Sequence, residues 1–263
     1  MNTSIDQVTD SEILSVFDDK HYASLAKANH DNYVNNNPYP HIVIDNFLPE
    51  KIAKTLIADY PTVETFDASW KYHDNQNTRR YFLDDATKFK FRLRLFATAV
   101  NSRSFLSFLE TISGIEALYG DPYFIGGGAM LTGTGGFLNI HADFNFHHKL
   151  QSWRRLNALF YLTPNWNKDW GGDLELWTTD GKQKVKSVEP VFNRLVVFTT
   201  TSKTFHGQPE PLKCPDDVFR RVFSAFYYAS KKDEESENDP HFTKYNVQQS
   251  PYSAKILEDY KNS

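Results

Sequence analysis

The chain has 263 residues and a formal net charge of −4, because 29 lysines and arginines stand against 33 aspartates and glutamates. A hydrophobic fraction of 40% supplies enough apolar side chains for a packed core, and the mildly acidic balance argues against nucleic acid as a required partner, since phosphate binding favours a basic surface. The single cysteine, Cys214, excludes an intrachain disulfide and fits a reducing compartment.

Neither a secretion signal nor a membrane span is expected from the chain. The first residues, MNTSIDQVTDSEILSVF, lack a basic start followed by an apolar stretch. No apolar run approaches the ~20 residues that cross a bilayer. We therefore expect a cytoplasmic protein, monomeric or homodimeric, with no membrane partner.

The first ninety residues predict two helices and one strand. Thr9 or Ser11 can cap a short helix within an N-terminal extension, residues 1–36, and the Asn-rich NYVNNNPYP predicts a loop. The run HIVID predicts a strand at 41–45, and FLPE opens a helix with proline near its first turn. Residues 61–90 show no regular pattern.

The rest of the chain changes from a helical to a strand pattern. Apolar residues recur at helical spacing from Phe91 to Leu118, which predicts a core-facing helix. After Tyr119-Gly120, turn signals separate six predicted strands, at Phe137–Phe146, Leu156–Leu162, Leu174–Thr178, Lys184–Val188, Arg194–Thr200 and Arg221–Tyr228. This spacing predicts an antiparallel sandwich or jelly roll within a mainly β, α+β fold that helices brace. One domain is predicted at 37–230, followed by a tail, residues 231–263, that packs on the domain or acts as a lid.

Two histidines and one aspartate form a candidate metal site. His141 and Asp143 are two residues apart on a predicted strand, so their side chains project from the same face. His206 follows the separate apolar run LVVF, and barrel-like closure can bring it opposite the first pair. Two imidazoles and a carboxylate are the ligand set of the non-haem Fe(II) facial triad, although composition also leaves zinc open. These residues alone fit a second interpretation equally well: a hydrogen-bonded His141–Asp143 pair, with His206 in a loop.

Two arginines precede the last apolar strand, VFSAFYY. Arg220 and Arg221 are neighbours, so they face opposite sides of the strand. An arginine that enters a β-core has to be paired, and its planar guanidinium matches a carboxylate. One of the two is therefore a candidate anchor for a dicarboxylic cosubstrate. The alternative is that both are rim arginines with surface partners.

Six segments in a fixed order resemble the Fe(II)/2-oxoglutarate-dependent dioxygenases, in particular their prolyl-4-hydroxylase-like branch. PYPHIVIDNFLPE is similar to the strand-then-helix entry of that family, and the core of the resemblance rests on FLNIHADFN, RRLNALFYLTP, WGGDLELW, NRLVVFTTTSKTFHGQPEPL and FRRVFSAFYYA. The resemblance spans roughly residues 37–230 and implies a double-stranded β-helix, a variant of the jelly roll. It implies His141, Asp143 and His206 as iron ligands. It also implies Fe(II), 2-oxoglutarate and O2 at the site, with ascorbate as a stimulating reductant.

The resemblance also implies an arginine partner for the far carboxylate of 2-oxoglutarate. On the family pattern this is Arg220, with Arg221 in reserve because Val222 stands where serine is frequent. Two asparagines are further candidates near the cosubstrate. Asn157 interrupts an apolar strand and needs a buried partner, and Asn145 is in phase with the aspartate of the HAD motif.

The expected reaction is hydroxylation of an unactivated C–H bond, with 2-oxoglutarate and O2 converted into succinate and CO2. Peptidyl proline, a free amino acid and another small metabolite all remain open as the substrate. The alternative is a cupin-like sugar-binding or isomerase domain, or a non-catalytic jelly-roll protein, although the chain lacks the H-x-H motif typical of cupins. His147 lies ~20 Å along an extended strand from His141, which is too far for it to bind the same ion. We therefore expect it to be a solvated residue at the strand end.

Overall fold

The structure is a computed structural model that describes residues 8–63, 71–72 and 79–246. The helices are α1 (Asp10–Leu14), α2 (Lys20–Val34), α3 (Glu50–Ala58), α4 (Phe91–Ala99) and α5 (Arg103–Ser113), with single 3-10 turns at Val16–Asp18, Ala86–Lys88 and Lys168–Trp170. The strands are β1 (His41–Ile44), β2 (Lys71–Tyr72), β3 (Arg80–Leu83), β4 (Tyr119–Gly120), β5 (Gly128–Thr132), β6 (Leu138–Ala142), β7 (Phe146–His147), β8 (Ser152–Tyr161), β9 (Leu174–Trp177), β10 (Lys184–Val188), β11 (Arg194–Thr199), β12 (His206–Gln208), β13 (Arg220–Ala229) and β14 (Lys244–Tyr245).

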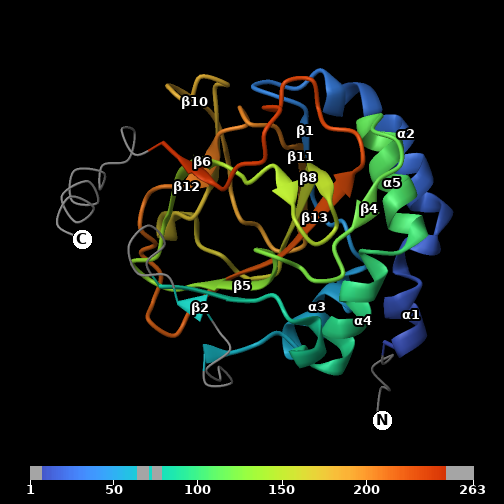
Figure 1. Cartoon of the computed structure of the whole chain (residues 1–263). Helices are drawn as coiled ribbons and strands as arrows, with labels where there is room; N and C mark the ends of the chain where they lie inside the picture. Colours follow the sequence, from blue (N-terminus) through green and yellow to red (C-terminus); the bar gives the residue numbers. More distant parts are fainter. Residues whose placement is uncertain (1–7, 64–70, 73–78, 247–263) are drawn as a thin grey trace, which may run out of the picture.

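The strands form two antiparallel sheets. The large sheet has the order β1-β11-β8-β13-β5-β3-β2, with β4 beside β13 and β7 beside β8, and the small sheet has the order β10-β9-β12-β6-β14. From β5 onward the chain passes repeatedly from one sheet to the other, so most neighbouring strands in each sheet are distant in sequence. The helices cover the outer face of the large sheet, at the right of Figure 1, and the small sheet lies on its other side. This is the predicted double-stranded β-helix.

An aromatic cluster joins the helices to the large sheet. Phe105 of α5 is fully buried, and its ring centroid lies 4.4 Å from that of Phe17 and 5.8 Å from that of Phe160 on β8. Tyr227 of β13 adds a contact at 5.9 Å. Large rings bury the most apolar surface of any side chain, so this cluster packs the sheet against its helical layer.

The first helix begins where the sequence predicts. The Thr9 side chain accepts a hydrogen bond from the Glu12 backbone N–H at 3.2 Å, and the Thr9 N–H donates to the Glu12 carboxylate at 2.8 Å. This reciprocal capping box satisfies two N–H groups that have no partner within the helix. Of the two predicted caps, Thr9 is therefore the one used.

The structure contains one helix that the sequence analysis missed. Residues predicted as polar extension and loop form α2, whose buried side chains are Tyr22, Ala26 and Tyr33. The stripe contains one small residue and two tyrosines, so its apolar periodicity is weak. Packing supplies the stability instead, because α2 lies against α5 and the Tyr33 hydroxyl is 2.8 Å from that of Thr199.

The single helix predicted from Phe91 to Leu118 is wrong in its extent. It is divided into α4 and α5, because the Ser102 side chain caps α5 by accepting from the Phe105 N–H. Gly114, with φ 72°, then ends α5 in the left-handed conformation that glycine adopts without strain. The region 61–90, predicted as irregular, also holds β3, which pairs with β5.

The strand predicted at 137–146 is interrupted directly after the HAD motif. β6 ends at Ala142 in the small sheet, and β7 pairs with β8 in the large sheet. Residues 143–145 therefore cross from one sheet to the other. The crossover places Asp143 at the end of a strand, in the space between the sheets.

The described part of the predicted tail lies against the small sheet. β14 pairs with β6, so that Tyr245 is opposite His141. Arg155 of β8 donates to the Lys231 carbonyl and to the Asp233 carboxylate. Residues 247–263 of the tail fall outside the described residues.

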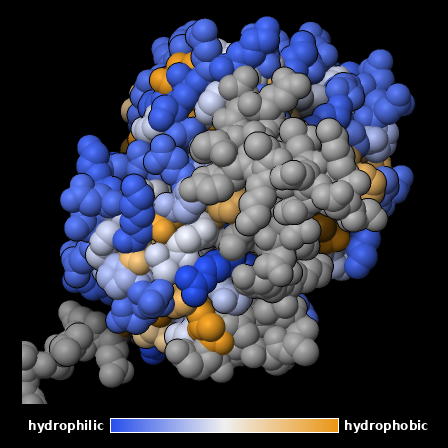
Figure 2. Space-filling view, turned by 90° about the vertical axis from the view of Figure 1, so that its left-hand side faces the viewer, coloured by the Kyte–Doolittle hydropathy of each residue, from blue (hydrophilic) through white to orange (hydrophobic). Residues whose placement is uncertain are grey.

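None of the helices placed in the structure combines the length and the apolar character of a membrane span. On the face at the left of Figure 1, the described side chains are mostly hydrophilic, with hydrophobic residues in small separate spots (Figure 2).

Replacing Phe105 tests the aromatic cluster. We expect Phe105→Ala to lower the free energy of unfolding by about 3–5 kcal/mol, since it leaves a cavity between helices and sheet. Phe91 of α4 is 61% exposed and provides the matched control, because Phe91→Ala should change stability by less than about 0.5 kcal/mol. Chemical denaturation of the three proteins measures both values. Equal stability of the two variants would contradict the packing described.

Candidate active site

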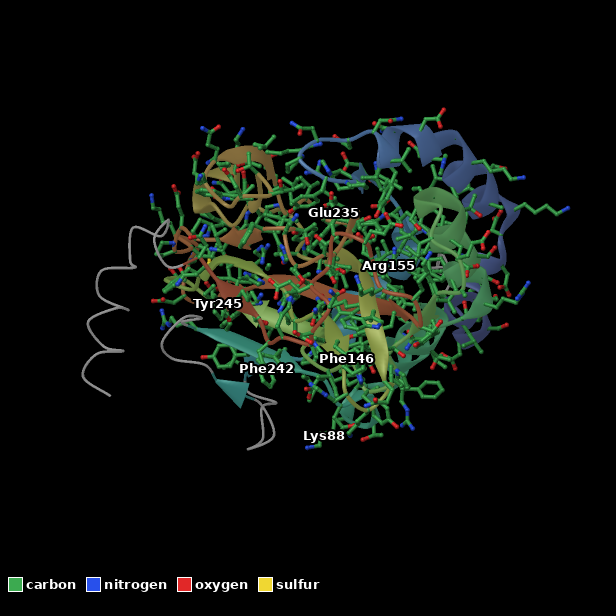
Figure 3. The ribbon with its side chains drawn as sticks, turned by 45° about the horizontal axis from the view of Figure 1, so that its top comes forward. Lys88, Phe146, Arg155, Glu235, Phe242 and Tyr245 are labelled. Atoms are coloured by element: carbon green, nitrogen blue, oxygen red, sulfur yellow. The ribbon has the colours of Figure 1, made fainter. Side chains whose placement is uncertain are left out.

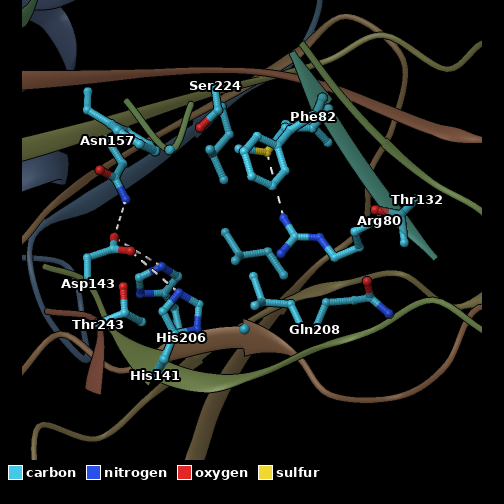
Figure 4. Close-up of a pocket in the computed structure, with 18 of the residues that line it drawn as sticks. Arg80, Phe82, Thr132, His141, Asp143, Asn157, His206, Gln208, Ser224 and Thr243 are labelled. Atoms are coloured by element: carbon cyan, nitrogen blue, oxygen red, sulfur yellow. Dashed lines mark hydrogen bonds and ion pairs between the residues drawn. The ribbon is translucent and has the colours of Figure 1, made fainter. Parts of the chain in front are cut away.

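A cavity of about 280 Å³ lies between the two sheets, and both sheets contribute to its lining. Its lining includes all three residues of the predicted metal site. His141 comes from β6 and His206 from β12, and the two residues are direct partners in the antiparallel register of the small sheet. Asp143 follows at the crossover. Figure 4 shows the three side chains together on one side of the cavity.

The three side chains converge on one point. The Nε2 atom of His141 lies 3.4 Å from Oδ1 of Asp143, and Nε2 of His206 lies 3.4 Å from Oδ2 of the same carboxylate. One ligand atom from each residue lies within 4.8 Å of the other two. An ion bound at about 2.1 Å holds neighbouring ligands roughly 3 Å apart, so the arrangement is of the right size for one cation.

The hydrogen bonds of the two imidazoles show which nitrogen faces the cavity. Nδ1 of His141 lies 2.7 Å from the Asn139 carbonyl, and Nδ1 of His206 lies 3.0 Å from the Thr204 carbonyl. A carbonyl only accepts, so Nδ1 carries the proton in both rings and Nε2 presents its lone pair. Two lone pairs therefore face a carboxylate with no proton between them. A divalent cation at their centre removes this repulsion, so the residues fit a metal ion.

Burial and charge keep this donor set in its metal-binding protonation state. Burial lowers the pKa of His206 to about 4, so the imidazole is neutral at physiological pH. Burial alone would raise the pKa of Asp143, but the Arg154 guanidinium lowers it well below its usual range. The carboxylate is therefore ionised while the neutral His206 imidazole can act as a ligand.

A closed network behind Asp143 fixes the orientation of its carboxylate. Nη2 of Arg154 lies 2.9 Å from Oδ2 of Asp143, and Nδ2 of Asn157 donates to the same oxygen at 2.8 Å. Arg154 also donates to Oδ1 of Asn157 through Nε at 2.9 Å and Nη2 at 2.7 Å. All three side chains are buried, so each polar contact replaces water that the site excludes. Asn157, a candidate from sequence, thus lies directly behind the triad.

Arg154 is a site residue that the sequence analysis missed. Its guanidinium carbon lies 3.5 Å from the ring centroid of Phe226 and 4.5 Å from that of Phe144. The two rings hold the flat guanidinium in place and compensate part of its burial. The signal in the sequence is the pair Arg154-Arg155 at the start of an apolar strand, because neighbours on a strand face opposite sides. Arg155 points outward to the C-terminal segment, and Arg154 points inward.

The structure separates the two arginines that sequence left as alternatives. Arg220 is buried and lines the cavity, and its Nη2 donates to the Tyr161 hydroxyl at 3.4 Å. Arg221 is outside the cavity lining, and its backbone N–H donates to Thr163 at 2.7 Å. Burial raises the pKa of Tyr161, so the phenol keeps its proton.

Another arginine enters the cavity from β3. Arg80 points into it from the side opposite the triad (Figure 4), and one of its nitrogens lies 3.7 Å from the Met130 sulfur. Burial, together with the charge of Arg220, lowers the pKa of Arg80 to about 10, so it stays charged at neutral pH. The sequence contained no regular pattern around Arg80 that could have predicted this position.

Two further polar residues fix the C-terminal segment and the hairpin beside the cavity. Asn145, a candidate from sequence, accepts from the His241 N–H at 2.7 Å and donates to the Asp239 carbonyl at 3.1 Å, and it is outside the cavity lining. His147 is buried beside Asp121, with Nε2 and Oδ2 3.3 Å apart, so the prediction of a solvated histidine is wrong. The reason is that β7 pairs with β8, and the ring lies beside those of Tyr228 and Tyr123, with centroid distances of 5.1 and 6.2 Å.

The fold and the site together define a metal-binding double-stranded β-helix protein, and comparison with protein families makes this more specific. Residues 127–229 match the family described as the 2OG-Fe(II) oxygenase superfamily. This range includes the triad, Arg154, Asn157 and Arg220. Over these residues, which form the candidate site, the chain is similar to the 2OG-Fe(II) oxygenase superfamily.

Individual relatives include several prolyl hydroxylases. The mouse protein prolyl 3-hydroxylase OGFOD1 is 28% identical over 195 residues, which cover 73% of this chain and 33% of that protein. The chain thus spans about a third of the length of this relative. A Trichoplax adhaerens prolyl hydroxylase, solved with a peptide of hypoxia inducible factor, matches with a TM-score of 0.58 and 19% identity over 80% of this chain and 91% of that one. A Pseudomonas putida prolyl-4-hydroxylase matches with a TM-score of 0.54 and 20% identity over 78% of this chain and 100% of that one. These two structures show a shared fold.

Exchange of Arg154 tests the network behind Asp143. We expect Arg154→Lys to weaken Fe(II) binding about tenfold, because lysine loses both the fork to Asn157 and the stacking on the two rings. Arg155→Lys is the matched control on the same strand and should leave the affinity unchanged. Anaerobic competition with a chromogenic chelator measures both. Equal Fe(II) affinities of the two variants would show that Arg154 does not support the site.

Proposed function

We propose that this protein is an Fe(II)- and 2-oxoglutarate-dependent hydroxylase, with peptidyl proline as the first substrate to test. The observation that carries the proposal is the presence of the His141–Asp143–His206 triad and Arg220 in a single cavity between the sheets. The match of residues 127–229 to the 2OG-Fe(II) oxygenase superfamily and the similarity to proteins named prolyl hydroxylases support it.

In the proposed site, His141, Asp143 and His206 hold Fe(II). Three protein ligands leave the other side of the ion open to cosubstrate and oxygen. Bound iron, with 2-oxoglutarate and O2, supplies the oxidising power that converts C–H into C–OH and yields succinate and CO2. The protein contributes position: the carbonyls of Asn139 and Thr204 fix the two imidazoles, and Arg154 and Asn157 fix the carboxylate.

Arg220 is proposed to bind the far carboxylate of 2-oxoglutarate. Its guanidinium already donates to the Tyr161 oxygen, which leaves the tyrosine proton available for a ligand oxygen. A guanidinium and a neutral phenol form a donor pair suited to one carboxylate. The neighbouring lining is apolar, with Leu159, Leu174 and Val222, so water is excluded around the pair and each hydrogen bond is strengthened.

Gly172 provides the space in which Arg220 lies. A Cβ atom at this position would meet Cδ of Arg220 at 3.2 Å and Cδ2 of Leu212 at 2.8 Å. The backbone of Gly172 has a φ of 87°, and that of its neighbour Gly171 has a φ of 71°, but a Cβ at Gly171 would meet nothing within 4 Å. The two glycines therefore share a positive φ that would strain a residue with a side chain, and they differ in their contact with the arginine.

We expect Gly172→Ala to raise the KM for 2-oxoglutarate at least about fivefold above that of Gly171→Ala. The added methyl group displaces Arg220, whereas backbone strain is common to both variants. Succinate formation at varied 2-oxoglutarate measures the KM values. Indistinguishable values would count against Arg220 as the anchor of the cosubstrate.

The proposed function itself is tested without knowledge of the substrate. Fe(II) and 2-oxoglutarate, mixed with the folded protein in the absence of oxygen, should give a visible metal-to-ligand charge-transfer band. Asp143→Ala should lose this band and should also lose coupled succinate formation, because it removes one ligand of the triad. A folded wild-type protein without the band would reject the proposal. It would then favour the alternative, a cupin-like sugar-binding or isomerase protein or a non-catalytic jelly-roll protein.

A further inference from the structure

A second hollow lies directly beside the candidate active site. This hollow, which we call the Phe242 groove, has a volume of about 180 Å³ and is lined by Ile125, Phe144, Phe146, His147, His148, Lys149, His241 and Phe242. Phe144 lines both the groove and the central cavity. The residue before it, Asp143, belongs to the triad. The groove therefore adjoins the site of the proposed reaction at Phe144.

Buried polar contacts hold the three walls of the groove together. The loop that carries Ile125 is joined to the hairpin after β7, because Asp121 accepts from the Ile125 N–H at 2.8 Å and lies 3.3 Å from His147. The C-terminal segment is joined to the crossover, because Asn145 accepts from the His241 N–H. A groove whose walls are fixed in this way needs little rearrangement when a ligand enters.

Two of the three histidines that line the groove, His147 and His241, direct their ring nitrogens elsewhere. Nδ1 of His147 accepts from the Leu150 N–H at 3.1 Å, and its Nε2 faces Asp121. Nδ1 of His241 donates to the Phe242 carbonyl at 2.8 Å, and its Nε2 lies 2.7 Å from the Ser202 hydroxyl. Both rings therefore present mainly carbon to the groove, which fits an apolar ligand better than a sugar or another polar metabolite.

Phe242 is exposed at the edge of this groove. Its side chain is 83% exposed, the largest value among the exposed large hydrophobic residues that the structure describes, and Ile125 across the groove is 37% exposed. Figure 3 shows Phe242 and Phe146 on the same side of the molecule, and both line the groove. An exposed aromatic residue at the rim of an apolar hollow is typical of a binding surface.

We propose that the Phe242 groove binds a bulky apolar side chain of a peptide substrate, one or two residues from the residue that is hydroxylated. This inference rests on the proposed function. A groove of about 180 Å³ suits one large side chain, and it opens to the surface, so the bound chain can continue beyond it. In an extended peptide each residue advances about 3.3 Å, so neighbouring side chains can occupy adjacent hollows on the two sides of Phe144. A free amino acid in the central cavity would leave the groove empty.

The test uses fluorescein-labelled nonapeptides with a central proline. Leu, Phe or Ala is placed at each of the two positions before and after the proline, with Gly and Ser elsewhere. Binding is measured by fluorescence anisotropy without oxygen, to the full chain with and without Fe(II) and 2-oxoglutarate. We expect one neighbouring position to favour Leu or Phe over Ala about tenfold in Kd, and Phe242→Ala to abolish that preference. Phe91→Ala, the exposed phenylalanine of α4, is the matched control and should retain it.

Three results would overturn the inference. The first is that no position of the peptide prefers an apolar residue. The second is that Phe242→Ala retains the same preference as the wild type. The third is that the protein turns over only a free amino acid or sugar, with the same KM in wild type and Phe242→Ala. Failure of the proposed function is recognised separately, because the charge-transfer band without oxygen needs no peptide. If the charge-transfer band forms but no peptide position prefers an apolar residue, only the proposal for the Phe242 groove is rejected. If a peptide position prefers an apolar residue but the band is absent, only the proposed iron chemistry is rejected.

Discussion

The structure depends on the burial of one carboxylate, that of Asp143, between two sheets. An ionised group taken out of water is stable only if charged and hydrogen-bonded partners replace the lost solvent. Here Arg154 and Asn157 provide them from β8 of the large sheet, while the two histidines approach from the small sheet. The carboxylate therefore links the two layers at the point where the chemistry is proposed to occur. Its removal would leave a buried guanidinium without its anionic partner.

The crossover after β6 contains three consecutive residues with different roles. Asp143 faces the cavity, Phe144 separates the cavity from the Phe242 groove, and Asn145 holds the C-terminal segment in place. These are consecutive residues, so the position of the groove relative to the triad is fixed by covalent geometry. The proposed hydroxylation site and the proposed recognition site thus share one short piece of backbone, and a peptide that fills the groove would have its neighbouring residue directed toward the triad.

The sequence predicted most strands of the core, and the structure brings the candidate triad and Arg220 into one cavity, because each depends on a local or familiar pattern. The i, i+2 spacing of His141 and Asp143 gives one face of a strand, and the apolar strand before His206 indicates where the third residue returns. Arg154 and Arg80 were missed for a different reason. Their roles depend on which strands of the two sheets lie opposite each other, and the spacing of residues along the chain does not predict that arrangement.

The errors in the predicted helices also have a physical origin. α2 is stabilised by packing of two tyrosines and an alanine against α5 and the sheet, which hydrophobic periodicity underestimates. The break between α4 and α5 depends on one serine cap within an otherwise continuous apolar stripe. His147 was expected in solvent because a strand end is usually exposed, but its ring is buried beside Asp121, Tyr123 and Tyr228.

The central claim is that one Fe(II) is held between the two sheets by three side chains. Anomalous X-ray diffraction at the iron edge, from crystals of the protein loaded with Fe(II) under anaerobic conditions, tests it directly. The account predicts a single iron peak per chain, about 2.0–2.2 Å from Nε2 of His141, Nε2 of His206 and one carboxylate oxygen of Asp143. A peak bound by other side chains, or no peak between these residues in fully loaded protein, would contradict it.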